Sequence, residues 1–350
     1  MRSGRDSDSG TLILNQDDVL EHLPMSECIE AMRDAFLALE RGEVRLPLRA
    51  VSALPYEAGW LGVMPVSLSN PPLAAVKAIT VIPANSATLL DSHQGAVLLF
   101  DASNGRLLSI LDASAITAIR TAAASGLATD VLARREAGDL AILGTGAQAS
   151  AHLDAVATVR TLRRVRVWGR DPERTTVFAA RESERLESRG RDGARGVRVE
   201  TAASARDAVN GADLVVTATA AKEPVLKGEW IAAGAHVNAV GACRPNQREL
   251  DGPAVARSRV IVDRRESAMA EAGDILLAIA EGAVGPEPIA AELGQVLAGS
   301  AAGRRNDDEI TLFKSVGIAI QDLAAARAAY ESAIAAGAGT AIDLGGRRHA

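Results

Sequence analysis

A glycine-rich motif is the clearest chemical signal in the sequence. Gly144 and Gly146 belong to GTGAQA, a GxGxxA pattern that follows the apolar run DLAIL and precedes a segment with helical spacing. The first glycine permits a tight turn, the second lets the backbone approach a pyrophosphate, and the small Ala149 allows close helix–strand packing. Amides at the helix N-terminus would face the phosphates with a favourable dipole. The motif predicts a nucleotide site; the alternative is a glycine turn with only a structural role.

The end of the next predicted strand distinguishes between the two nicotinamide cofactors. The strand VRVW is followed by Gly169, Arg170 and Asp171. NAD enzymes usually place an acid here to bind the ribose 2′-hydroxyl, whereas a guanidinium suits the 2′-phosphate of NADP. Arg170 therefore favours NADP(H), with NAD(H) as the alternative because Asp171 follows directly. In the other interpretation, Arg170 is a solvated turn residue and Asp171 caps the next helix ahead of Pro172.

Lysine is rare in this chain. Only four of the 38 basic residues are lysines, and one of them, Lys77, lies within the apolar segment AAVKAIT. A buried and unpaired ammonium group is costly, so Lys77 needs either an anionic ligand or an ion pair. Cys28 and Cys243 are too few and too far apart for a disulfide framework or a zinc site. We therefore expect no metal, and a reducing cytoplasmic compartment.

The composition is that of a globular chain in water. The 350 residues include 48% hydrophobic and 23% charged residues and carry a formal net charge of −6. Without surplus positive charge, binding to nucleic acid or to an anionic membrane is not expected. No apolar run reaches the roughly 18 residues of a membrane span. Residues 1–10 are polar and lack the apolar core of a secretory signal, so we expect a disordered leader.

The N-terminal third of the chain has the pattern of an α+β unit. A helical pattern covers residues 17–42, with Ser26 as its expected N-cap. Strands are predicted at 61–68, 74–82 and 96–101, and the pair Asn104-Gly105 predicts a hairpin. An alanine-rich helix is expected at 116–132. These elements indicate an antiparallel sheet with helices packed on it.

From residue 138 onward, strands and helices alternate as in a parallel, doubly wound sheet. We therefore expect an α/β fold in which a Rossmann-type domain, residues 131–309, is inserted into an α+β domain. That second domain is built by both chain ends, residues 11–130 and 310–335, and includes an amphipathic helix at 311–332. Residues 336–350 are expected to form a flexible tail.

Six ordered blocks of the chain resemble the ornithine cyclodeaminase/mu-crystallin family. They are SHQGAVLLFDASNGRLLSILD, ITAIRTAAAS, ILGTGAQA, EPVLKGEW, GAHVNAVGACRPNQRELD and TLFKSVGIAIQD. The resemblance extends over residues 12–330. It implies a homodimer whose substrate-binding and dimerisation domain is formed by both chain ends. It also implies a central NAD(P)-binding domain and a small imino or amino acid as the substrate.

The resemblance further implies which residues form the site. Arg49 in LPLRAVS and Lys77 match positions that hold the substrate carboxylate, and Arg120 matches an arginine between substrate and cofactor. Converging cations orient a carboxylate and bring C2 towards the nicotinamide, so Lys77 and Arg120 are the expected catalytic residues. Cys243 and Glu271 match further positions near the substrate. The other matches are to cofactor positions, at Ser92, His93, Thr121, Thr145, Ala147, Gln148, Thr219, Ala220 and Ser315.

One position departs from the cyclodeaminase branch of that family. Ornithine cyclodeaminases carry an aspartate where this chain, aligned on Pro245, has Cys243. A carboxylate there can pair with the substrate amine and handle its proton, and a thiol with an ordinary pKa of about 8.5 is a poor substitute. The stretches EPVLKGEW and RPNQRELD are closer to the mu-crystallin-like branch. The resemblance associates that branch with imine reduction.

The expected function is therefore that of an NAD(P)H-dependent ketimine reductase, an oxidoreductase acting on CH–NH bonds. It would reduce Δ1-pyrroline-2-carboxylate or Δ1-piperideine-2-carboxylate to L-proline or L-pipecolate. Three alternatives stay open. They are an ornithine cyclodeaminase that forms L-proline and ammonia, an alanine dehydrogenase, and a protein that binds NADPH and a small carboxylate without turnover.

Overall fold

The computed structural model describes residues 10–188, 192–194 and 196–346. Its contacts divide the chain into two compact units. The first unit consists of Met1–Arg120 and Ala319–Ala350, and the second unit is Thr121–Ile318. The second unit therefore begins inside α3 (Ala113–Leu132) and ends after β15 (Ile310–Lys314), whereas the sequence patterns place its limits at 131 and 309. The expected leader, apart from Gly10, lies outside the described residues.

The first unit is built on a mostly antiparallel sheet. Its strand order is β16 (Thr340–Ile342), β1 (Thr11–Leu14), β7 (Leu107–Asp112), β6 (His93–Asp101), β5 (Leu73–Val81), β4 (Trp60–Leu68) and β2 (Val44–Arg45), and β3 (Ala50–Ala53) also pairs with β4. The β1–β7 pair is parallel. Between β6 and β7, Gly105 has a φ of +79°, which a glycine adopts without strain. The predicted hairpin is thereby confirmed.

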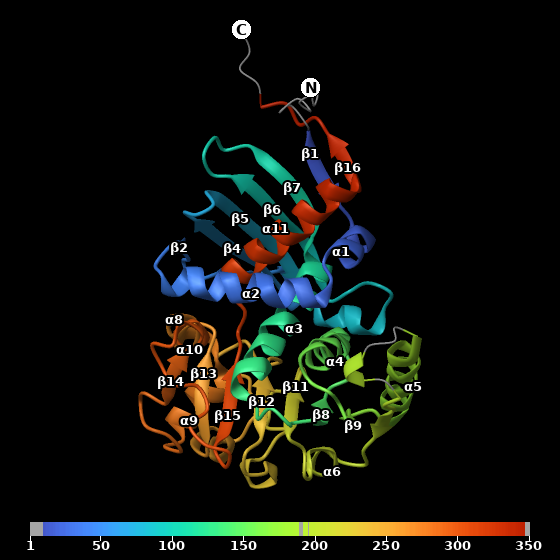
Figure 1. Cartoon of the computed structure of the whole chain (residues 1–350), viewed down its shortest axis with the longest axis vertical. Coiled ribbons are helices and arrows are strands. Elements are labelled where there is room, and N and C mark those ends of the chain that lie inside the picture. Colours follow the sequence, from blue (N-terminus) through green and yellow to red (C-terminus); the bar gives the residue numbers. More distant parts are fainter. Residues whose placement is uncertain (1–9, 189–191, 195, 347–350) are drawn as a thin grey trace. The chain divides into compact units, whose positions relative to one another are not determined.

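Helices cover one face of this sheet. The helices α1 (Gln16–His22), α2 (Met25–Glu40) and α11 (Ala319–Ala336) lie on the same side of it, and α11 contacts β4, β5 and β6 (Figure 1). Alternate residues of β5, among them Lys77 and Ile79, are buried beneath this helical layer. The single helix expected over 17–42 is instead two helices, because Pro24 lacks the amide that a continuous helix needs. Pro24, not Ser26, is the N-cap of α2.

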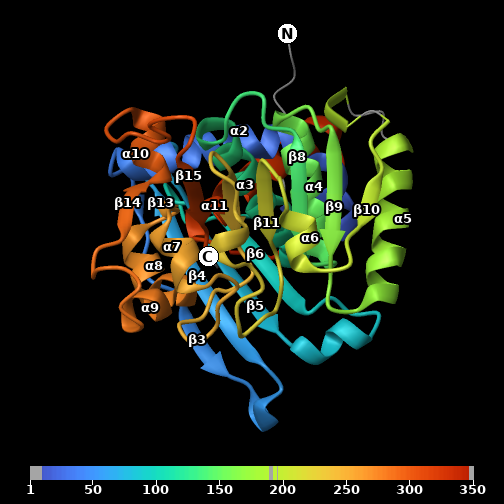
Figure 2. The same ribbon diagram turned by 90° about the horizontal axis from the view of Figure 1, so that it is seen from below.

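The second unit is the doubly wound sheet that the alternating pattern predicts. Its strand order is β10 (Val199–Thr201), β9 (Arg164–Trp168), β8 (Asp139–Leu143), β11 (Leu214–Thr217), β12 (His236–Ala239), β15, β13 (Ser258–Val262) and β14 (Ile289–Glu292) (Figure 2). Neighbouring strands are parallel. The order reverses between β8 and β11. In such sheets, ligands bind outside the carboxyl ends of the strands at the reversal.

Helices connect these strands and complete the core of the second unit. They are α4 (Ala147–Val159), α5 (Pro172–Ser188), α6 (Ala205–Val209), α7 (Gly252–Ala256), α8 (Arg265–Glu271), α9 (Gly273–Ala280) and α10 (Leu293–Ala298). Leu153 and Val156 of α4 pack with Leu140 and Ile142 of β8 in one fully buried cluster. Two short 3-10 turns of this unit are η3 (Asp192–Ala194) and η4 (Gly228–Trp230). Two more, η1 (Pro55–Glu57) and η2 (Pro83–Ala87), belong to the first unit.

The C-terminal part of the chain corrects two sequence predictions. The expected helix over 311–332 is wrong in its first part, because Ile310–Lys314 is strand β15, buried between β12 and β13. A strand buried on both faces is a continuous apolar run and shows no alternation, so helical spacing fits it equally well. The expected flexible tail is wrong for Thr340–Ile342, which pair antiparallel with β1 as β16. Residues 347–350 lie outside the described part of the chain.

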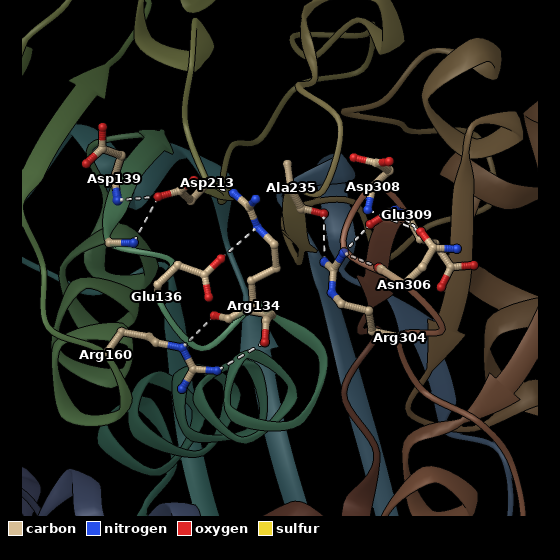
Figure 3. A network of polar contacts seen from close by, with 12 residues as sticks. Arg134, Glu136, Asp139, Arg160, Asp213, Ala235, Arg304, Asn306, Asp308 and Glu309 are labelled. Carbon is tan, nitrogen blue, oxygen red and sulfur yellow. Dashed lines mark hydrogen bonds and ion pairs between the residues drawn. The ribbon is translucent and has the colours of Figure 1, made fainter.

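A polar network fixes the amino ends of the strands in the second unit (Figure 3). Asp213, just before β11, accepts hydrogen bonds from the amides of Gly138 and Asp139 and pairs with Arg134 at 2.8 Å. Arg160 donates to carbonyl groups at the end of α3, where helical carbonyls lack intrahelical partners. Arg304 donates to Leu132 and Ala235. These side chains stabilise the edge of the sheet opposite to the one where ligands of such folds bind.

Candidate active site

Two cations in the first unit converge on one carboxylate. Lys77, in the middle of β5, is 2% exposed, and its Nζ lies 2.8 Å from Oδ1 of Asp322 on α11. The same Oδ1 accepts a hydrogen bond from Arg120 Nε at 2.9 Å. Lys77 Nζ also donates to the Thr117 hydroxyl at 3.3 Å, and Arg120 Nη1 donates to Gln321 Oε1 at 2.6 Å. The structure thus brings together the two residues that the resemblance identifies as catalytic.

Burial and charge shift the pKa values in this cluster. Burial lowers the pKa of Lys77 to about 7, the charges of Arg120 and Arg49 lower it as well, and Asp322 opposes them. Burial alone would raise the pKa of Asp322, but Arg120 and Lys77 together hold it below its usual range. Arg49 is half-buried and close enough to Lys77 to act on its charge. The three predicted carboxylate-binding cations therefore lie in one electrostatic cluster.

Ser92 and His93 lie at the start of β6 and form a local group. The Ser92 hydroxyl and His93 Nδ1 are 2.9 Å apart, and Asp91 Oδ1 accepts a hydrogen bond from the His93 amide. Burial lowers the pKa of the His93 imidazole; Lys77 and Arg120 lower it further, and Asp91 raises it. His93 therefore lies close to the cation cluster and is held towards its neutral form.

The glycine motif in the second unit has the form that a dinucleotide needs. Gly144 has a φ of +131°, and a Cβ there would lie 2.4 Å from the carbonyl oxygen of Ala218. Gly146 is the N-cap of α4, and a Cβ there would meet nothing within 4 Å. Thr145 and Gln148 beside it are half-buried, and Ala147 is exposed. The first glycine is required by the fold, and the second leaves open space in front of a helix N-terminus. These residues fit a pyrophosphate.

The two candidate residues for cofactor choice have different environments. Asp171 Oδ1 accepts hydrogen bonds from the amides of Glu173 and Arg174 at 3.0 and 3.1 Å, so it caps α5. Arg170 is exposed and has no hydrogen bond or ion pair with another described residue. One oxygen of the Asp171 carboxylate is therefore used within the protein, while the guanidinium group next to it has no partner among the described residues.

A buried glutamate organises the loops at the carboxyl ends of β11 and β12. Glu249 is 0% exposed and accepts hydrogen bonds from the amide and hydroxyl of Thr219, the hydroxyl of Thr217 and the amide of Gly241. Burial and the neighbouring Asp274 raise its pKa. Thr219 is a predicted cofactor residue whose polar groups bind Glu249, and Ala220 next to it is exposed.

Lys314 connects this glutamate to Cys243. Its Nζ lies 2.8 Å from Asp274 Oδ2 and donates to the carbonyl group of Ala242 at 2.5 Å. Burial lowers the pKa of Lys314, but Asp274 and Glu249 raise it above its usual value, and Cys243 acts in the same direction. Cys243 is half-buried in the loop after β12 and directly follows Ala242, whose carbonyl group binds the Lys314 ammonium group.

The remaining predicted residues lie at separate positions. The Ser315 hydroxyl donates to Asp263 Oδ2 at 3.1 Å, and the same oxygen accepts from the amides of Val316 and Gly317. Burial raises the pKa of Asp263, although these donors oppose the shift. Thr121 is buried in α3, and Glu271 is half-buried at the end of α8. Within the described residues, no group of acids, histidines or cysteines could hold a metal ion.

The acids of these networks are not among the site residues that the sequence predicts. Asp322, Glu249, Asp263 and Asp274 are each 1% exposed or less and bind the cations and loops of the predicted site. Asp322, Asp263 and Asp274 occur in or next to an apolar stretch, where a charged side chain needs a partner. Glu249 lies in the polar stretch NQRELD, which gives no such signal. That signal was available for Asp322 within TLFKSVGIAIQD, but the partner could not be found without the fold.

Known proteins resemble this chain over nearly its whole length. The family model for the ornithine cyclodeaminase/mu-crystallin family matches residues 9–337. Ketimine reductase mu-crystallin of Mus musculus is 38% identical over 323 residues, covering 91% of this chain and 96% of that protein. A Delta(1)-pyrroline-2-carboxylate reductase of Bacillus cereus is 35% identical over 334 residues, covering 95% of this chain and 100% of that protein.

A solved structure agrees with these sequence relatives. The Thermococcus litoralis Delta(1)-pyrroline-2-carboxylate reductase in complex with NADH and L-proline superposes with a TM-score of 0.90 at 38% identity, covering 95% of this chain and 100% of that one. The family match, the identities and the fold point to the same group of proteins. The chain therefore belongs to the ornithine cyclodeaminase/mu-crystallin family.

Proposed function

We propose that the protein is an NAD(P)H-dependent reductase of cyclic imine carboxylates that forms L-proline from Δ1-pyrroline-2-carboxylate or L-pipecolate from Δ1-piperideine-2-carboxylate. The observation that carries the proposal is the buried pair of cations, Lys77 and Arg120, in a chain 38% identical to a reductase solved with NADH and L-proline. Both relatives described above are named as imine reductases, which agrees with this substrate class.

In this proposal, the cation cluster holds the substrate carboxylate. Lys77 uses two of its three N–H donors on Asp322 and Thr117, and Arg120 uses its Nε and one Nη. Donors are therefore left on both side chains, and Arg49 adds a third positive charge. A carboxylate bound by charge-assisted hydrogen bonds is fixed in orientation as well as position.

The reaction itself demands little proton chemistry from the protein. A cyclic ketimine that binds with its ring nitrogen protonated is an iminium ion, whose C2 accepts a hydride directly. A reduced nicotinamide, when bound, would supply this hydride; the C2–H bond would form as the C=N π electrons become the nitrogen lone pair. The side chains then have to orient C2 and exclude competing reactions, which is the task we assign to Lys77, Arg120 and Arg49.

We propose NADP(H) as the preferred cofactor. Arg170 is exposed just after β9, the strand that follows the glycine motif and its helix, and a guanidinium group suits a 2′-phosphate. Asp171, the residue that would favour NAD(H) by binding the 2′-hydroxyl, instead caps α5. The solved relative contains NADH, so NAD(H) is the alternative cofactor.

Cys243 supports reduction over cyclodeamination. An ornithine cyclodeaminase would need a carboxylate at this position to take the proton of the substrate amine. Lys314, close to Cys243, already forms an ion pair with Asp274. The substrate amine would therefore meet a thiol there, and no carboxylate that could take its proton. We infer that this protein does not expel ammonia from ornithine.

A paired assay on one preparation tests the proposal. One arm follows oxidation of NADPH, and separately of NADH, with Δ1-pyrroline-2-carboxylate and Δ1-piperideine-2-carboxylate; the other follows ammonia and proline from L-ornithine with NAD. We expect turnover in the first arm only. Ammonia from ornithine would contradict the proposal in favour of a cyclodeaminase. A third reaction contains pyruvate and ammonia; oxidation of NADPH in it, but with neither cyclic imine, would favour an alanine dehydrogenase. Binding of NADPH without any turnover would favour a binding protein.

We also propose that the protein is a homodimer. One face of the first unit's sheet packs on helices, whereas the opposite face has a row of apolar side chains across neighbouring strands. Ile13, Ile110, Leu98 and Val76 pair in register along this row, and each is only partly buried. A second copy of this sheet could cover the row by face-to-face packing. No helix among the described residues is long and apolar enough to cross a bilayer.

A further inference from the structure

We propose that Asp322 is a positioning residue that favours the charged form of the Lys77 ammonium group and holds it together with Arg120 for the substrate carboxylate. The inference rests on the proposed function for the identity of that carboxylate. It adds a residue that acts through Lys77 and Arg120, and it predicts how binding of the substrate depends on pH.

The geometry shows why one acid can serve both cations. A single oxygen, Oδ1 of Asp322, accepts from Lys77 Nζ at 2.8 Å and from Arg120 Nε at 2.9 Å. Asp322 is 1% exposed, and the two cations are 2% and 4% exposed. Gln321, the preceding residue on α11, binds Arg120 Nη1 at 2.6 Å. Adjacent residues of one helix therefore hold the guanidinium group at two points and the ammonium group at one.

The charges around Lys77 explain why the acid is needed. The groups that face it are Asp322 on α11, Arg120 and the neutral Thr117 on α3, Arg49 from the segment before β3, and His93 at the start of β6. Without Asp322, two arginines would surround a buried amine. Burial and these charges already lower the pKa of Lys77 to about 7 in the presence of Asp322. Removing the acid removes a raising influence, so the pKa falls further.

A fall in that pKa has a defined effect on binding. The neutral amine of Lys77 cannot form an ion pair, so affinity for a carboxylate decreases as pH rises through the pKa of Lys77. When Asp322 is replaced by Asn, this decrease begins at a lower pH. Below that pH, Lys77 stays charged and the cluster has lost a negative charge, so the variant binds carboxylates at least as well as the wild type. A purely structural role for Asp322 would weaken binding equally at every pH.

The small number of lysines allows a direct measurement on the full chain. With 13C-labelled lysine, NMR shows only four side chains, at Lys77, Lys222, Lys227 and Lys314, and Lys→Arg variants assign the signals. We expect Lys77 to titrate near neutral pH and Asp322→Asn to move its midpoint down by about one pH unit or more. Lys314, paired with Asp274 in the second unit, serves as the internal control and should not move. An unchanged Lys77 midpoint would overturn the inference.

A binding arm separates this inference from the proposed function. The affinity of wild type and Asp322→Asn for L-proline, and for acetate as a simple carboxylate probe, is measured between about pH 5.5 and 8.5. We expect the two affinity curves to cross, with the variant at least about tenfold weaker at the alkaline end. A uniform loss at all pH values would contradict the inference. If Lys77 shifts but no imine is reduced, the proposed function fails alone; if imines are reduced and Lys77 does not shift, this inference fails alone.

A second background guards against misfolding of the variant. In Lys77→Arg, the cation near the carboxylate no longer titrates in this range. Asp322→Asn added to Lys77→Arg should therefore leave the pH dependence of binding unshifted, whereas the same change in the wild type shifts it. Asp322→Glu, which keeps the charge, should restore the wild-type midpoint. An equal shift in both backgrounds would mean that Asp322 acts through some group other than Lys77.

Discussion

Cationic side chains have different tasks in the two units. In the first unit, Lys77 and Arg120 share one carboxylate oxygen, and each keeps N–H donors that no other described residue uses. In the second unit, Arg160 and Arg304 spend their donors on backbone carbonyl groups. A charged residue type in the sequence therefore does not by itself identify a binding residue; unused donors at a place that a ligand of the fold would reach are needed as well. By this criterion Arg170 is available and Arg160 is not.

Arg170 provides the residue-level test of cofactor choice. We expect Arg170→Ala to raise the KM for NADPH about tenfold or more and to leave the KM for NADH nearly unchanged, because only NADPH has the 2′-phosphate that the guanidinium would bind. Steady-state kinetics with both cofactors measures this. Arg206→Ala, another exposed arginine of the second unit, is the matched control. Equal effects on the two KM values would refute the role of Arg170.

Cys243 provides a second residue-level test. A carboxylate introduced by Cys243→Asp would lie near Lys314 and compete with Asp274 for its ammonium group. We expect kcat/KM for the cyclic imine to fall about tenfold or more, with dimerisation intact. Cys243→Ser, which keeps a small polar group, should retain most of the activity. Unchanged reduction by Cys243→Asp would mean that Cys243 lies outside the reaction centre.

The sequence pointed to the cations of the candidate site but not to the acids that hold them. Lys77 stood out because lysine is rare and its segment is apolar, and Arg49 and Arg120 came from the family resemblance. Their common neighbour Asp322 is 245 residues from Lys77 in the chain, so no local spacing connects the two. Glu249 likewise binds Thr219 and Gly241 through the fold alone. Long-range ion pairs are settled by topology, which local patterns do not encode.

At the scale of elements, the second unit separates stability from binding. The carboxyl ends of its strands bear the glycine motif and the loops ordered by Glu249. The amino ends are fixed by the network of Arg134, Asp213 and Arg304 (Figure 3). This division follows the general rule for open parallel sheets. Substitutions at the amino ends should therefore change stability and leave catalysis alone.

Asp213 tests this division. The carboxylate pairs with Arg134 at 2.8 Å and Arg163 at 2.7 Å and accepts two amide hydrogen bonds. We expect Asp213→Asn to lower the free energy of unfolding by about 2 kcal/mol and to leave KM values unchanged, as measured by urea unfolding and steady-state kinetics. The exposed Asp17→Asn serves as the control. A changed KM with unchanged stability would contradict the division.

The stability effect of Asp213→Asn should depend on pH. Burial raises the pKa of Asp213, but the amides of Gly138 and Asp139 together with Arg134 and Arg163 lower it below its usual value. A lowered folded-state pKa stabilises the protein above the unfolded-state pKa of about 3.9, and this stabilisation is lost as pH falls. The stability difference between wild type and Asp213→Asn should thus be full at neutral pH and shrink below about pH 4.

Element prediction succeeded where periodicity was distinctive. The strand–turn–helix at the glycine motif and the β6–β7 hairpin were both predicted from turn residues and alternation. The strand β15 was missed because all five of its residues are buried, so it has no polar face to reveal a period of two. The strand β16 was missed because its pairing with β1 joins the two ends of the chain.

At the scale of the whole molecule, the first unit's sheet has the open apolar row defined by Ile13, Ile110, Leu98 and Val76. Leu98→Glu would place a carboxylate in the middle of this row. If a second copy covers the row, we expect the mass measured by light scattering after gel filtration to shift from dimer towards monomer. Val177→Glu, at a position 68% exposed on α5, is the control. A wild-type monomer, or a dimer indifferent to Leu98→Glu, would contradict the proposal.

The most direct test of the central claim follows the hydride itself. The protein is incubated with Δ1-pyrroline-2-carboxylate and NADPH deuterated at C4 of the nicotinamide, once for each face of the ring, and the proline is analysed by NMR and mass spectrometry. We predict L-proline with one deuterium at C2 from one of the two labelled cofactors, and loss of this product in Lys77→Met. Formation of proline without deuterium at C2 from either cofactor, or no reduced product from this imine or from Δ1-piperideine-2-carboxylate treated in the same way, would contradict the assignment of this chain as an imine reductase.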